Sequence, residues 1–145
     1  MRCKRVIGGL ALVGILVLAD CAGRSGGESL ASRTLVELSR QVDSSIQNRR
    51  RADEARGATR RMDKEIGKLE AALARAGRDL ARINRDYDAT REDFDRVLDK
   101  LDETREHTSE RLVVLIMDLR HAMSEQEWNQ AYEGMAAYRD SLDRR

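Results

Sequence analysis

Apolar and small residues recur through the middle of the chain at alternating steps of four and three residues. They are Met62, Ile66, Leu69, Leu73, Ala76, Leu80, Ile83, Tyr87, Thr90, Phe94, Val97 and Leu101. A β-strand cannot use this period, whereas an α-helix that packs against another helix can. Since the chain also contains no proline, we predict one long helix from about residue 58 to 122, and we call its apolar stripe the seam.

The segment before the seam carries a weaker pattern. Residues 28–47 place leucines, a valine and an isoleucine mostly three or four positions apart, which predicts a helix. Residues 47–61 contain no large apolar side chain. Two interpretations of this segment remain open: a solvated helix that joins its neighbours, or a hinge near Asn48 or Gly57.

After Leu101 the seven-residue spacing slips, because the next large apolar residue in phase is Leu112. A step of 11 residues locally unwinds a left-handed supercoil. The segment that follows, from Leu112 to Met117, is apolar on every side of a helix. Such a segment is normally covered on several sides, so we expect more than two helices to meet here.

The most specific local signal lies in residues 123–128. Ser124 and Glu127 have the spacing of a capping box, and Met123 and Trp128 flank them as a hydrophobic staple does. This predicts a chain reversal and a short C-terminal helix from about 125 to 143 that folds back against Leu112–Leu119. Trp128 has the spacing of a core residue, so we interpret it as a packing residue.

Composition agrees with an elongated all-α fold, a coiled coil or helical hairpin over residues 28–145. Charged residues make up 37% of the chain and aromatic residues only 3%, which favours long helices over a compact globule. Few bulky residues remain to line a substrate pocket. We therefore expect no enzyme, no cofactor and no small-molecule substrate.

Metal binding is not expected either. The two histidines, His107 and His121, are 14 residues apart, which places them about 21 Å apart on one helix. That distance is too long for two ligands of one metal ion.

The N-terminus has the pattern of an export signal. A short basic segment, residues 1–5, precedes an apolar run at 6–19; the run is shorter than the roughly 20 residues that span a bilayer. Leu18-Ala19-Asp20-Cys21 follows, and it resembles the lipobox of bacterial lipoprotein precursors. The resemblance implies a signal peptide at 1–20, a diacylated Cys21, and a flexible tether at 21–27.

The lipobox resemblance departs from its family at Asp20, where a small neutral residue is usual. Three alternatives therefore remain: a lipoprotein, a soluble periplasmic protein cleaved after Ala19, or a retained anchor. For the lipoprotein, Ala22 implies an outer-membrane location facing the periplasm in a Gram-negative cell. Two acyl chains would attach the domain stably to that membrane.

Charge is segregated along the seam. Residues 44–85 carry 12 Lys and Arg against 6 Asp and Glu, and residues 86–110 carry 4 against 10. Two parallel copies would place like charges together, whereas an antiparallel pair crossing near Arg85 would place opposite charges together. We therefore predict a homo-oligomer or a helical protein partner, with antiparallel pairing favoured.

A cluster of arginines begins at Arg49, Arg50 and Arg51. It is interpreted either as a solvated helix face or as a contact for an anionic surface, such as lipid headgroups, lipopolysaccharide phosphates or an acidic protein. Nucleic acid is not expected as a partner, because the compartment does not fit and no aromatic residues are interleaved for base stacking.

Two functional hypotheses follow. The first is a non-enzymatic cell-envelope lipoprotein with a structural or protein-interaction role through its coiled coil. The second is a periplasmic stress chaperone or accessory sensor, because Met123–Trp128 is loosely similar to the Leu-Thr-x-x-Gln turn of the Spy/CpxP-like helical periplasmic proteins. That resemblance implies a cradle with a concave apolar face.

Overall fold

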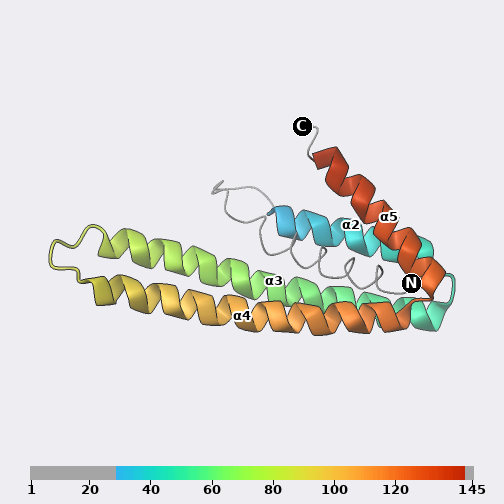
Figure 1. The fold of residues 1–145 in the computed structure, drawn as a ribbon, viewed down its shortest axis with the longest axis horizontal. Helices are drawn as coiled ribbons and strands as arrows, with labels where there is room; N and C mark the ends of the chain where they lie inside the picture. Colours follow the sequence, from blue (N-terminus) through green and yellow to red (C-terminus); the bar gives the residue numbers. More distant parts are fainter. Residues whose placement is uncertain (1–28, 143–145) are drawn as a thin grey trace, which may run out of the picture.

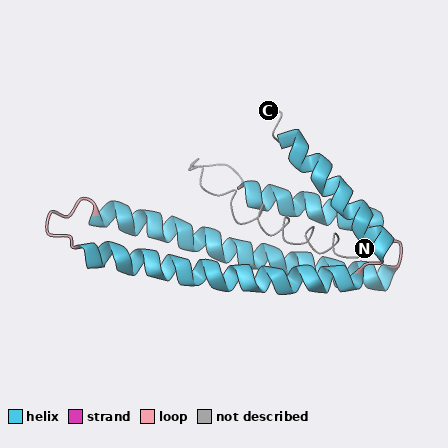
Figure 2. Cartoon of the chain, in the orientation of Figure 1, coloured by secondary structure: helices cyan, strands magenta, loops and turns pink. Residues whose placement is uncertain are grey.

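The computed structural model describes residues 29–142, and all regular secondary structure within them is α-helical (Figures 1 and 2). The all-α helical hairpin predicted from the sequence is confirmed. The helices are α2 (Leu30–Ser45), α3 (Arg49–Ile83), α4 (Arg91–Ala122) and α5 (Glu125–Leu142). The signal peptide at 1–20, the lipid site at Cys21 and the tether at 21–27 lie outside the described residues.

Helices α3 and α4 form a long antiparallel hairpin (Figure 1). The single helix predicted from about 58 to 122 is therefore wrong in its extent, because the chain reverses between Ile83 and Arg91. In this turn, Asp86 Oδ1 accepts a hydrogen bond from the Asp88 N–H at 3.1 Å. Asp93 Oδ2 then accepts from the Thr90 N–H at 2.9 Å, which starts α4.

The reversal folds the seam onto itself. Ala76 and Ile83 of α3 are buried, although α2 does not extend this far along the hairpin (Figure 1). The two halves of the seam thus pair antiparallel within one chain, and the turn lies where the charge changes sign. The predicted pairing with a second copy or another helical protein stays a prediction. Within the described residues, Arg61 of α3 and Asp118 of α4 form one ion pair across the hairpin at 3.3 Å.

Helix α2 packs along the first half of α3. Ser29 caps it by accepting a hydrogen bond from the Ser32 N–H at 3.0 Å, and the hydroxyls of Ser29 and Ser32 both donate to the Glu70 carboxylate. A break at residues 46–48 follows, where the Asn48 side chain caps α3. The chain therefore bends near Asn48, and the second hinge candidate, Gly57, lies inside α3.

Alanines fill the centre of the bundle. Ala52, Ala55 and Ala58 of α3 are 4%, 0% and 1% exposed, and Met62 next to them is fully buried. Residues 49–61 are therefore a helix that buries its alanine face and keeps its charged face in solvent. Small side chains let α3 approach its neighbours closely, so this face is buried without large apolar residues.

Helix α5 folds back as predicted, but its main neighbour is α2 and not Leu112–Leu119 of α4 (Figure 1). At the crossing, the Gln41 side chain of α2 occupies the space beside Gly134 that a Cβ atom would fill. The α4 segment expected to be covered on several sides keeps one exposed face. Leu112, Leu115 and Ile116 are buried, whereas Val113, Val114 and Met117 are 46%, 50% and 43% exposed.

Candidate functional site

Hydrogen bonds at the start of α5 connect this helix to α3. Glu127 Oε2 accepts a hydrogen bond from the Ser124 N–H at 2.7 Å, and the Ser124 hydroxyl accepts from the Glu127 N–H at 3.3 Å. These two bonds complete the capping box. The same carboxylate accepts from the Arg51 guanidinium at 2.6 and 2.9 Å, so one residue both caps α5 and binds α5 to α3.

This environment favours the charged carboxylate. The hydrogen bond from the Ser124 backbone N–H lowers the pKa of Glu127 below its ordinary value, and the Arg51 hydrogen bonds and charge act in the same direction. The Glu127 side chain is 12% exposed and that of Arg51 is 37% exposed. The pair is therefore partly shielded from solvent.

Trp128 is partly buried and packs against the apolar core. The void beside it, between α2, α4 and α5, measures only about 10 Å³. Such a space holds at most one water molecule, so it is no ligand cavity. Trp128 is thus a packing residue of the bundle in this structure.

The arginine cluster at the start of α3 is divided. Arg51 is bound to Glu127, whereas Arg50 is 89% exposed and pairs with Glu54 at 3.1 Å. Arg49 is exposed beside them. Of these three arginines, Arg49 and Arg50 face solvent and Arg51 has a structural partner.

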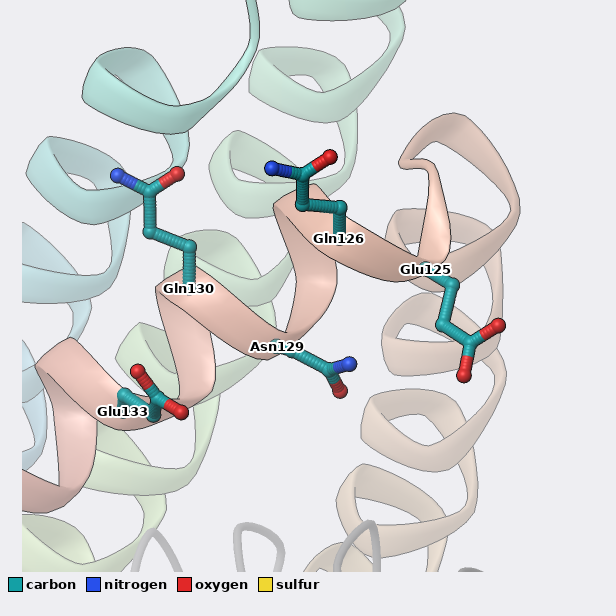
Figure 3. A pocket seen from close by; sticks show the side chains of 5 residues that line it. All are labelled: Glu125, Gln126, Asn129, Gln130 and Glu133. Carbon is teal, nitrogen blue, oxygen red and sulfur yellow. The ribbon is translucent and has the colours of Figure 1, made fainter.

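A hollow that opens to solvent lies on the polar face of α5. Figure 3 shows the side chains that line it: Glu125, Gln126, Asn129, Gln130 and Glu133. All five come from one helix face. The hollow brings together no nucleophile and base, and it has no apolar wall to exclude water.

Within residues 29–142, no three His, Cys, Asp or Glu side chains are grouped closely enough to hold a metal ion. The two histidines, His107 and His121, are exposed on α4. None of the helices that the structure describes combines the length and the apolar character needed to cross a bilayer.

The outer faces of the hairpin are the remaining candidate surfaces. Val113, Val114 and Met117 form an exposed apolar patch on α4. At the tip of the hairpin, Tyr87 is 100% exposed. An exposed aromatic at the end of a rigid helix pair and an apolar patch on its flank are both features of protein-interaction surfaces.

Sequence reasoning missed the apolar patch and the turn. The patch was missed because all six residues of 112–117 are apolar, so the pattern does not reveal which face is covered. The turn had a recognisable signal: Thr90 and Asp93 repeat the spacing of the capping box at Ser124.

Comparison of the chain with protein-family models, curated proteins and solved structures finds no match.

Proposed function

We propose that this protein is a non-enzymatic cell-envelope lipoprotein that presents the α3–α4 hairpin as a rigid surface for protein contacts. The hairpin is the observation that carries the proposal. With 35 residues in α3, it is about 50 Å long, and α2, with 16 residues, is less than half as long. The remainder is a two-helix rod whose outer faces are free of other described elements (Figure 1).

The sequence supports the membrane anchor. Cys21 and Ser29 are eight residues apart, so a tether between them spans at most about 29 Å. A lipid on Cys21 would keep the bundle close to the membrane surface and leave the hairpin accessible in the periplasm. The proposed location is the outer membrane, with the soluble periplasm as the alternative.

Intact-mass analysis of the protein extracted from membranes tests the anchor. We expect the mass of a chain that begins at diacylglyceryl-Cys21. The Cys21→Ser variant is expected to lose the acyl mass and leave the membrane fraction, whereas Asp20→Ala is expected to keep both. A mature chain that begins at Asp20 or at Met1 would contradict the lipoprotein assignment.

The exposed patch of Val113, Val114 and Met117 favours a second candidate, a periplasmic chaperone-type binding module. Such a protein would bind unfolded clients through apolar surface. Suppression of the aggregation of a denatured model protein measures this activity. Loss of suppression in Val113→Ser/Met117→Ser, with suppression retained in the matched tip variant Tyr87→Ser, would favour the chaperone over the rod.

A further inference from the structure

The outer face of α4 carries a row of acidic residues that have almost no neutralising partner. Its members recur at helical spacing on the exposed side of the helix: Glu92, Asp95, Asp99, Asp102, Glu103, Glu106 and Glu110. Within residues 29–142, Asp95 is the only member of this row that forms an ion pair, with Arg91 at 3.5 Å. Carboxylates four residues apart repel one another, so this row destabilises an isolated helix.

The outer face of α3 carries the opposite charge. Its exposed basic residues are Arg60, Lys64, Lys68, Arg75, Arg78 and Arg82. Lys68 pairs with Glu65 and Arg82 with Asp79; the other four have no ion pair in the described part of the chain. Exposed Gly67, Ala71 and Ala74 lie between them, and a Cβ atom at Gly67 would meet nothing within 4 Å, so this face is open to close approach.

The two rows lie at the same level along the hairpin but on opposite sides of it. The antiparallel course of α3 and α4 places Glu92–Glu110 level with the second half of α3, where Arg75, Arg78 and Arg82 lie. Each row points away from the buried seam, so one chain cannot neutralise its own rows. A second chain placed edge to edge would bring them together.

We propose that this protein associates with further copies of itself, edge to edge, through the acidic face of α4 on one copy and the basic face of α3 on the next. The apolar patch joins the same contact. The Arg61–Asp118 ion pair shows that Met117 is level with the start of the basic row, so the patch of one copy meets the aliphatic stems of Arg60 and Lys64 on its neighbour.

This contact is heterologous, because two different faces meet. Each copy therefore keeps one free acidic edge and one free basic edge, and the association continues as a row of parallel hairpins. This self-association rests on the proposed role of the hairpin as a surface for protein contacts, but it does not depend on the lipid anchor. If the mass of the mature chain contradicted the lipid, the edge contact would remain to be judged by its own test.

Sedimentation velocity of the full-length chain in detergent provides that test. We expect concentration-dependent association at about 50 mM salt that weakens at least tenfold at about 500 mM, because screening shortens the reach of exposed charges from more than 10 Å to a few Å. A wild-type chain that stays monomeric at every concentration at low salt would overturn the proposal.

Charge reversal assigns the two faces. Asp99→Lys/Glu103→Lys/Glu106→Lys and Lys64→Glu/Arg75→Glu/Arg78→Glu are each expected to weaken self-association more than tenfold, and a mixture of the two is expected to restore it. Glu54→Lys/Glu125→Lys/Glu133→Lys changes the net charge as much as the first variant does but lies away from both faces, so it should associate like the wild type. If either charge-reversed variant self-associates by itself as strongly as the wild type, the assignment of the two faces is wrong.

A second measurement uses the unaltered sequence. Carbodiimide joins a lysine amine to a carboxylate in direct contact. In an equal mixture of ¹⁴N- and ¹⁵N-labelled chains, we expect mixed-isotope cross-links from Lys64 or Lys68 to the acidic row of α4. Intermolecular links that avoid these two faces, or links confined to single chains, would overturn the proposal.

Discussion

The Glu127 carboxylate holds the Arg51 guanidinium in a two-point ion pair, with oxygen–nitrogen distances of 2.6 and 2.9 Å. The two residues are 76 positions apart in the sequence, and their contact joins the first turn of α3 to the first turn of α5. Because the Ser124 N–H also donates to Glu127, local helix capping and tertiary packing depend on the same side chain.

We expect Glu127→Ala to lower the free energy of unfolding by about 2 kcal/mol, of which the lost cap accounts for about 1 kcal/mol and the unpaired Arg51 for most of the rest. Urea titration followed by circular dichroism measures this. A double-mutant cycle with Arg51→Ala should give a coupling energy of about 1 kcal/mol. Glu133→Ala, an exposed glutamate on the same helix, is the control and should change little.

Acidification should weaken the bundle in a predictable range. The pKa of Glu127 lies below its ordinary value of 4.5 in the folded chain. Its contribution is therefore complete above that value and is lost as the pH falls through the lowered folded pKa. Glu37, hydrogen-bonded to Arg40, and Asp93, hydrogen-bonded to Thr90, also have lowered pKa values and act in the same sense.

The melting temperature should consequently fall between about pH 5 and pH 2, and it should fall less steeply in Glu127→Gln. Thermal melts of the two proteins at matched ionic strength make the comparison. Equal slopes in both proteins would show that Glu127 does not contribute to the pH dependence.

Overpacking the alanine centre should be costly. Ala55 is 0% exposed, so Ala55→Leu must displace neighbouring helices, and we expect a loss of about 1–3 kcal/mol. Ala71→Leu adds the same side chain at an exposed position on the same helix and should be nearly neutral. Denaturant midpoints of the two variants test the difference, and equal midpoints would mean that the alanines are not tightly packed.

Loss of the α4 cap should loosen the tip of the hairpin more than the bundle. Asp93 accepts hydrogen bonds from the Thr90 N–H at 2.9 Å and the Thr90 hydroxyl at 2.8 Å. Asp93→Ala should therefore lower the stability of the first turn of α4. Hydrogen exchange should locate the effect in the first turns of α4. Asp95→Ala, two residues further along the chain, is the control and should leave hydrogen exchange unchanged.

The sequence predicted the helices more reliably than their connections. The capping box at Ser124–Glu127 is a local signal, and it located α5 to within a residue at each end. The reversal at 84–90 was missed because Tyr87 and Thr90 continue the four-and-three spacing, although Tyr87 lies wholly in solvent. Spacing alone cannot separate a buried seam residue from a turn residue that happens to be in phase.

The position of the turn coincides with the change of charge sign, but that change was interpreted as a contact between two chains. The change of sign next to Arg85 was interpreted as the crossing point of two chains, whereas one chain folds back there. The change of sign alone does not show whether the seam pairs within one chain or between two, and the short turn favours pairing within the chain. Burial of Ala52, Ala55 and Ala58 was hidden for a related reason, since alanine is equally common on solvated helices.

Because α5 packs on α2, the apolar face of α2 can be covered only after the C-terminal part of the chain has been synthesised. Helices α3 and α4 are adjacent in sequence and can pair as soon as both have been synthesised. Leu38 and Val42 of α2, in contrast, are covered in part by Ala131 and Met135 near the end of the chain. A nascent or truncated chain that stops before residue 124 would therefore display an apolar face that the finished protein conceals, and quality-control proteases could recognise incomplete molecules by it.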